Sequence, residues 1–359
     1  MKLALAAIVV ALALPAQAAA QAPRPAAAYH PPRAADGHPD LEGVWTNASL
    51  TRLERNPKFG ERLALSEAEA AQIEGHNRAL MRLGDKPTDP QAKVTDLPAD
   101  CSDGRGTNCN YNAGWTDPGT TVMRVAGQPR SSFITTPADG RIPLRKGVRP
   151  SPPNRLKPGA NPSDNPETRA LGERCLLGFG GTSGPVMLPV LYNNTYQIVQ
   201  APGRLAILVE MDHDVRIVRM GTREHLPPTV RPWMGDSVGW WEGDTLVIET
   251  TNFHPEETLR GASDHLKVTE RLTRVGPGRL HYAFRVEDPS VFTQPWGGEY
   301  EFSATRGPVY EYACHEGNYA LAGILAGARE EDRTGIKTAP TNIDQVAARL
   351  ERNEGEDGP

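Results

Sequence analysis

The second half of the chain alternates short apolar-rich runs with tight turns. Turn residues such as Pro202-Gly203 and Gly276-Pro277-Gly278 separate the runs. Strands joined by such turns are antiparallel neighbours, and about eight of them can close on themselves. The pattern predicts a mainly β fold, an antiparallel meander that closes as a lipocalin-like β-barrel or a sandwich, with a few peripheral helices. The predicted strands are residues 195–200, 205–210, 215–220, 245–251, 266–274, 280–287, 299–305 and 309–313.

The first half has fewer periodic segments. Residues 40–45 predict a short strand with Trp45 as a core residue. Ser66 followed by Glu69 has the spacing of a capping box and predicts a helix that continues to about residue 83. Segments 122–125 and 132–135 flank Gly127 and predict a hairpin. Further short helices are expected over residues 317–329 and 342–351.

The N-terminus has the pattern of an export signal. Lys2 precedes an apolar run and a stretch of small residues, which predicts a signal peptide over residues 1–20. The run is shorter than the roughly 20 residues that a membrane anchor needs. We therefore expect a periplasmic or secreted protein without a membrane anchor. Residues 21–40 are rich in Pro and Ala and predict a flexible segment, ahead of a single β-rich domain over residues 41–359.

The β-rich domain is expected to have four parts. The sequence divides it into a helix and hairpin part, a Pro-rich loop, the main β-barrel and a C-terminal tail: residues 41–148, 149–170, 171–330 and 331–359.

Charge and known motifs exclude several classes of function. The 359 residues include 39 Lys+Arg and 44 Asp+Glu, a formal net charge of -5 that leaves no broad basic surface for nucleic acid or anionic lipid. The sequence has no phosphate loop, dinucleotide fingerprint, nucleophile elbow or helical zinc motif. We therefore expect a small-molecule ligand or substrate and no cofactor. The oligomeric state stays open.

The chain has four cysteines, which in an oxidising compartment most simply form two disulfides. Cys101 and Cys109 would close a short loop rich in Asp, Gly and Asn. Cys175 and Cys314 would then join the start of the main β region to its end. The alternative makes Cys314 a nucleophile beside His315.

The densest polar group follows the predicted strand 205–210. We expect Glu210 to pair with Arg216 across the turn and thereby to orient His213. Histidine titrates near neutral pH, so an oriented His213 could exchange a proton with a ligand at the barrel mouth. The alternatives are a solvated turn with an ordinary ion pair, and a metal site.

A second polar group lies where the last predicted strand meets a helix. A disulfide at Cys314 would hold His315 and Glu316 rigidly, as an acid or base requires. The alternative is structural, with Glu316 and Asn318 capping the helix.

Residues from the remaining turns have the composition of a pocket rim. Zinc bound by His213, His225 and His315 and calcium bound at Asp212 and Asp214 are weaker alternatives, because no ligand spacing supports them. Tryptophans at strand ends can stack on a ligand but are more often core residues. The expected ligand-binding residues are His225, Trp233, Asp236, Trp241, Asn252 and Tyr319.

The second half of the chain contains five sequence motifs that are specific in combination. They are Gly172-Glu173-Arg174-Cys175-Leu176, Tyr192-Asn193-Asn194-Thr195-Tyr196-Gln197-Ile198-Val199-Gln200, His213-Asp214-x-Arg216, Trp241-Glu242-Gly243-Asp244-Thr245-Leu246-Val247 and Tyr312-Ala313-Cys314-His315-Glu316-Gly317-Asn318-Tyr319. With them, residues 172–329 resemble a family of secreted, largely uncharacterised bacterial β-rich proteins. The resemblance implies one recurring polar site that contains the His213 turn and the His315 segment. It implies no catalytic assignment. The phrase Asp40-Leu41-x-Gly43-x-Trp45 is similar to the entry strand of lipocalin-like barrels.

Together these features predict an exported, cofactor-free acid–base enzyme. It would be a lyase, isomerase or hydrolase acting on a small organic ligand, such as an aromatic or sugar-derived one, at the barrel mouth. His213 or His315 would be the base, Glu316 or Glu210 the acid or orienting group, and Arg216 would hold an oxygen of the substrate. The alternatives are a non-catalytic, lipocalin-like carrier and a structural module.

Overall fold

The computed structural model describes residues 29–84, 117–148, 163–178, 184–256 and 259–335. The chain divides into two units, Met1–His30 and Pro31–Pro359, and every helix and strand described below belongs to the second. The predicted signal peptide, the Cys101–Cys109 pair, most of the Pro-rich loop and the predicted helix over residues 342–351 lie outside the described residues.

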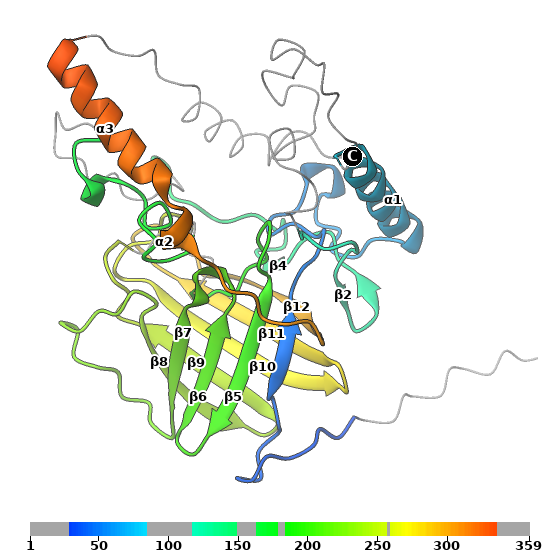
Figure 1. Ribbon diagram of the computed structural model, residues 1–359. Coiled ribbons are helices and arrows are strands. Elements are labelled where there is room, and N and C mark those ends of the chain that lie inside the picture. Colours follow the sequence, from blue (N-terminus) through cyan, green and yellow to red (C-terminus); the bar gives the residue numbers. More distant parts are fainter. Residues whose placement is uncertain (1–28, 85–116, 149–162, 179–183, 257–258, 336–359) are drawn as a thin grey trace, which may run out of the picture. The chain divides into compact units, whose positions relative to one another are not determined.

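Nine strands join edge to edge into a closed barrel, which confirms the predicted fold class (Figure 1). Around the ring, β1 pairs with β5 on one side and with β12 on the other, and the remaining strands follow in chain order. The strands are β1 (Gly43–Thr46), β5 (Thr195–Ala201), β6 (Arg204–Val209), β7 (Val215–Met220), β8 (Asp236–Glu242), β9 (Thr245–Thr251), β10 (Lys267–Gly276), β11 (Arg279–Glu287) and β12 (Trp296–Ala304).

One pair departs from a plain antiparallel meander. Strands β7 and β8 are parallel, with Val218 opposite Ser237. A parallel pair needs a connection that brings the chain back to the end where it started, and residues 221–235 provide one. Strand β8 was not predicted, because its pattern of burial does not alternate and so gives no period-two signal.

The entry strand β1 closes the barrel and supplies a core residue, as predicted. Trp45 is 2% exposed, and its Nε1 donates to the carbonyl of Leu41 at 3.1 Å. The Arg274 guanidinium on β10 lies 5.7 Å from the centre of the Trp45 ring. The same guanidinium donates to the carbonyl of Asp40 at 2.6 Å. A cation–π contact and a hydrogen bond thus attach the entry segment to β10.

The barrel interior is a packed core with a polar centre. Aromatic rings from β11 and β12, among them Tyr282, Tyr300 and Phe302, pack against one another there. Arg216 on β7 and Glu270 on β10 form an ion pair that is almost completely buried. The Tyr282 hydroxyl donates to Glu270 Oε1 at 2.8 Å. A buried charge pair costs less when hydrogen bonds satisfy its remaining atoms, so these polar groups belong to the core.

The segment around Met187 lies against this polar centre. The Met187 N–H donates to the Tyr282 hydroxyl at 3.2 Å. Its carbonyl accepts from the Tyr300 hydroxyl and, at 3.1 Å, from Asn47 Nδ2. Val186, Met187 and Leu188 are all buried. The interior hydroxyls therefore satisfy backbone groups of a loop that would otherwise be buried without partners.

Small strands attach the first half of the chain to the barrel. Strand β4 (Ile134–Thr136) pairs with β12, where a Cβ atom on Gly298 would lie 2.1 Å from the carbonyl oxygen of Phe133. A hairpin forms around Gly127, but not between the predicted segments: β2 (Arg124–Val125) pairs with β3 (Gln128–Pro129). The predicted return strand 132–135 is wrong, because residues 134–136 pair with the barrel instead.

Three α-helices occur in the described residues. Helix α1 (Glu67–Gly84) begins with the predicted capping box: the Glu69 N–H donates to Ser66 Oγ at 3.2 Å, and the Ser66 N–H donates to Glu69 Oε2 at 2.8 Å. Helices α2 (Cys314–Gly317) and α3 (Tyr319–Thr334) follow the barrel. None of these helices is both long and apolar enough to cross a membrane.

Candidate acid–base site

The turn between β6 and β7 contains a short 3-10 segment, η7 (Met211–His213). Asp212 and His213 both have positive φ, 58° and 46°. Such a backbone is uncommon for residues other than glycine, and Asp and His adopt it more readily than most. The turn buries Asp212, which is 8% exposed, and leaves His213 exposed.

Residues 305–318, called the strap below, lie against this turn (Figure 1). The Cys175–Cys314 disulfide, confirmed as predicted, fastens its end. Asn318 Nδ2 also donates to the carbonyl of Glu173 at 2.8 Å. The predicted strand 309–313 is wrong: the Tyr310 N–H donates to the Glu210 side chain, and the Tyr312 carbonyl faces His213. These backbone groups therefore find their partners on the turn and not on a neighbouring strand.

The predicted ion pair between Glu210 and Arg216 is wrong. Glu210 is 3% exposed and accepts from two backbone N–H groups, those of Thr195 at 3.1 Å and Tyr310 at 2.8 Å. Side-chain alternation along β7 points Arg216 into the barrel, where Glu270 meets it. Glu210 lies beyond the end of β6. It therefore holds the strap, while Arg216 belongs to the core.

Asp212 has an unsatisfied buried oxygen. Its Oδ2 atom is buried and has no hydrogen-bond partner among the described residues. Burial raises the pKa of Asp212, and the nearby charges of His213 and His315 only partly offset that effect. The turn and the strap thus bring both predicted histidines close to one buried carboxyl group. Burial thus shifts the protonation equilibrium of that group toward its neutral form.

His213 is oriented by the strap. Its Nδ1 atom lies 3.0 Å from the carbonyl oxygen of Tyr312. A carbonyl oxygen can only accept, so neutral His213 carries its proton on Nδ1 and has its basic lone pair on Nε2. The ring is exposed, so Nε2 is the nitrogen that can receive a proton from a ligand.

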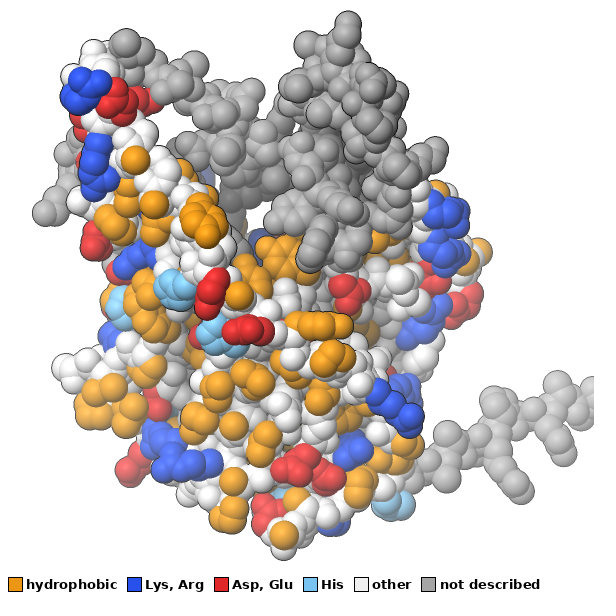
Figure 2. All heavy atoms as spheres, viewed as in Figure 1, with side chains coloured by type: hydrophobic (Ala, Val, Ile, Leu, Met, Phe, Trp, Pro, Cys, Tyr) orange, Lys and Arg blue, Asp and Glu red, His pale blue; other side chains and the backbone are white. Residues whose placement is uncertain are grey.

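The other residues predicted for this site lie at its edge. His315 and Glu316 are exposed on α2, and Tyr319 is 82% exposed at the start of α3. Asn318 accepts from the Leu321 N–H at 3.3 Å and caps α3. Figure 2 shows histidine and acidic side chains side by side on the surface next to α2.

His225 and Asp236 belong to a different group on the outside of the barrel. His225 Nδ1 lies 2.9 Å from Asp236 Oδ2, and Nε2 lies 3.3 Å from Glu249 Oε1. Arg219 and Lys267 complete the group, at 2.9 Å from Asp236 and 2.5 Å from Glu249. We call these five residues the outer-wall network. The structure does not place them on a pocket rim, since they fasten residues 221–235 to the wall.

The remaining predicted ligand-binding residues have protein partners. Asn252 Nδ2 donates to the carbonyl of Leu226 at 2.8 Å. The Trp233 ring lies 3.9 Å from that of His254, and the Trp241 ring stacks on His38 at 4.9 Å, measured between centroids.

The described residues contain no group of three or more His, Cys, Asp or Glu side chains arranged to hold a metal ion. Comparison of the chain with family models, with curated proteins and with solved structures gave no match.

Proposed function

We propose that the protein is an exported, cofactor-free acid–base enzyme acting on a small organic substrate, with Asp212, His213 and His315 as its site. The observation that carries this proposal is the buried Asp212 oxygen, which has no hydrogen-bond partner among the described residues and lies near two histidines. A buried polar atom without a partner costs about 1–3 kcal/mol and therefore requires an explanation, and a catalytic role is the one that we propose for Asp212. The disulfide supports export, because such bonds persist in oxidising compartments.

The two ionisable groups have complementary roles. His213 Nε2 takes a proton from the substrate or from an attacking water. Asp212, whose pKa is raised by burial, in its protonated form gives a proton to the carbonyl or leaving oxygen. His315 lies near enough that a positive charge on its ring would stabilise the carboxylate that forms. Proton exchange with solvent then restores both groups. In a hydrolase, the water oxygen bonds to the carbonyl carbon and the bond to the leaving oxygen breaks. In a lyase, a C–H bond and the bond to the leaving oxygen break as a double bond forms. In an isomerase, His213 instead returns its proton to a second carbon of the enol, and Asp212 takes its own proton back from the enol oxygen.

The proposal changes two roles that the sequence favoured. Glu210 and Arg216 are structural, since each is satisfied within the protein. The carrier alternative has less support, because the side chains that point into the barrel are buried against one another.

The test is an activity panel with a matched histidine control. The purified mature chain is assayed on p-nitrophenyl acetate, on a lactone, and for deuterium exchange next to a ketone carbonyl. At least one reaction should exceed the buffer rate and fall roughly 100-fold in His213→Gln and in Asp212→Asn. His265→Gln is the control, since His265 is also exposed and lies 3.9 Å from Asp264. Equal rates in all variants, or no reaction in the panel, would contradict the proposal.

A further inference from the structure

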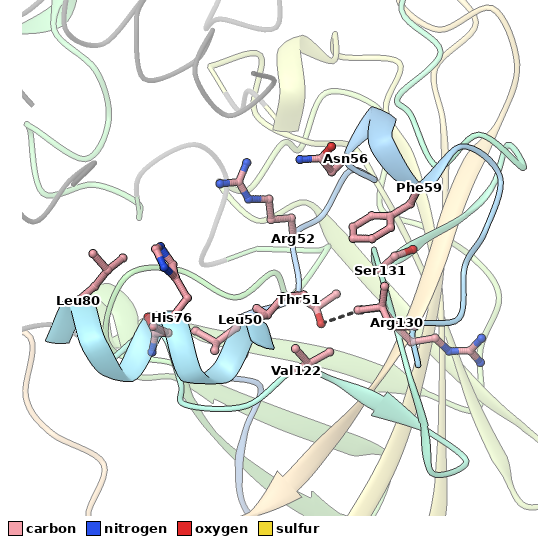
Figure 3. Close-up of a pocket in the computed structure, with 13 residues that line it drawn as sticks. Leu50, Thr51, Arg52, Asn56, Phe59, His76, Leu80, Val122, Arg130 and Ser131 are labelled. Atoms are coloured by element: carbon pink, nitrogen blue, oxygen red, sulfur yellow. Dashed lines mark hydrogen bonds between the residues drawn. The ribbon is translucent and has the colours of Figure 1, made fainter. Parts of the chain in front are cut away.

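A hollow of about 180 Å³ lies beside α1, and no residue of the acid–base site lines it. Its walls are mainly apolar and come from α1 and from the segments around residues 50–65 and 122–131. Figure 3 shows Leu80 and His76 projecting from α1, with Phe59 and Ser131 across the hollow. An apolar hollow with a few polar groups is the usual form of a small-molecule site, and this one suits a ligand smaller than a typical drug.

The polar groups at the hollow favour an anion. Arg52, Asn56 and His76 project toward the same side of it (Figure 3). None of the thirteen residues that line the hollow is acidic. Arg52 carries a permanent positive charge, and His76 becomes positive when protonated. A carboxylate in the hollow would therefore meet hydrogen-bond donors and no acidic side chain among the lining residues.

Asn77 gives an independent indication of a missing partner. It lines the hollow, and its Nδ2 atom is buried without a hydrogen-bond partner among the described residues. Buried amide donors are normally satisfied, and leaving one unpaired is costly. A ligand oxygen in the hollow would remove that cost.

We propose that this hollow binds a small carboxylate with an apolar body, of the size of benzoate or a short fatty acid. The apolar body covers the walls formed by Phe59, Ile73 and Leu80. The carboxylate accepts from Arg52 and Asn77. The site is distinct from the acid–base site, so it serves either to capture a second ligand or to regulate the protein.

The test is a titration of the mature chain with benzoate, followed by NMR, and with benzyl alcohol as the neutral analogue. Benzoate should bind saturably with a Kd on the order of 1 mM, and benzyl alcohol at least about fivefold more weakly. Arg52→Gln and Asn77→Leu should each weaken benzoate at least about fivefold. Arg78→Gln is the matched control, because Arg78 is exposed on α1 and does not line the hollow.

The two variants also separate binding from folding. Asn77→Leu removes the unpaired amide, so it should melt at a higher temperature than the wild type while binding benzoate more weakly. If Asn77→Leu lost binding only because its fold was weakened, its melting temperature would be lower than that of the wild type. Absence of saturable benzoate binding by the wild type would overturn the proposal. So would equal affinity in Arg52→Gln, Asn77→Leu and Arg78→Gln.

Discussion

The acid–base site and the outer-wall network both place a histidine beside a buried aspartate, but with opposite results. Burial opposes the charge of Asp236 too, yet hydrogen bonds from the Leu226 N–H, Arg219 and His225 outweigh it and lower the pKa of that carboxyl. Asp212 has an unsatisfied oxygen, and burial raises its pKa. Hydrogen-bond partners, and not residue types, therefore set the direction of the pKa shift. The satisfied group is structural, and the unsatisfied one is the candidate site.

Removing the disulfide should have the largest effect on stability. The bond fastens the acid–base site but not the outer-wall network. We expect Cys175→Ser with Cys314→Ser to lose about 4 kcal/mol of unfolding free energy, since the bond restrains a long loop in the unfolded chain. The two cysteines are 139 residues apart. Denaturant unfolding measures the loss. A loss below about 1 kcal/mol would show that the strap is held mainly by its hydrogen bonds.

Asp236→Asn should have the next largest effect. It removes the charge that Arg219 and His225 share, and we expect it to cost about 2–3 kcal/mol of stability without changing activity. Asp264→Asn is the control, because Asp264 is 43% exposed and its pair with Arg231 should contribute less than about 1 kcal/mol. Similar losses in both variants would contradict a structural role specific to the network.

The contribution of Asp236 to the free energy of unfolding should depend on pH. Because the folded pKa of Asp236 is lowered, its contribution is present above the unfolded value of about 3.9 and is lost as the pH falls through the folded value. Unfolding free energies of the wild type and Asp236→Asn should therefore converge in acid. Curves that stay parallel would contradict this linkage.

Asp212→Asn should have a smaller effect of the opposite sign. The folded pKa of Asp212 is raised, so its ionisation destabilises the fold as the pH rises above about 3.9. Asn accepts the positive φ of this position and carries no charge. We expect the unfolding free energy of Asp212→Asn to exceed that of the wild type by about 1 kcal/mol at mildly alkaline pH, and the two to be equal in acid. A variant less stable than the wild type at every pH would contradict the raised pKa.

Substitution of either histidine by glutamine should have the smallest effect on stability. His225 has two acidic partners, so His225→Gln should cost about 1 kcal/mol. His213→Gln should change stability by less than about 0.5 kcal/mol, because the ring is exposed. Thermal unfolding of both variants measures the difference. Equal costs would remove the distinction between the two regions.

Much of the fold follows from local pattern. Period-two runs predict seven strands of the barrel, and the Ser66–Glu69 spacing predicts where α1 begins. Strand β8 escapes this kind of prediction because Asp236, Ser237, Val238 and Gly239 are all buried. The strap, residues 305–318, could not be predicted for another reason. Its backbone groups form hydrogen bonds with side chains of a turn that is distant in sequence.

The site is only half predictable. The spacing of the cysteines predicts the Cys175–Cys314 bond, which brings the His315 segment to the strap, and the polar turn draws attention to His213. The partner of Arg216 depends on how the barrel closes, since Glu270 is 54 residues away. The burial of Asp212 depends on the backbone conformation of η7. The sequence Glu210-Met211-Asp212-His213 contains no pattern that predicts this conformation.

The most direct test of the central claim is an NMR titration of the mature chain that follows the Asp212 carboxyl carbon and the ring nitrogens of His213. We predict that Asp212 titrates above the ordinary aspartate value of about 3.9, while Asp236 titrates below it. We also predict that neutral His213 carries its proton on Nδ1. An Asp212 carboxyl that titrates at or below the ordinary value, or a His213 protonated on Nε2, would contradict the account.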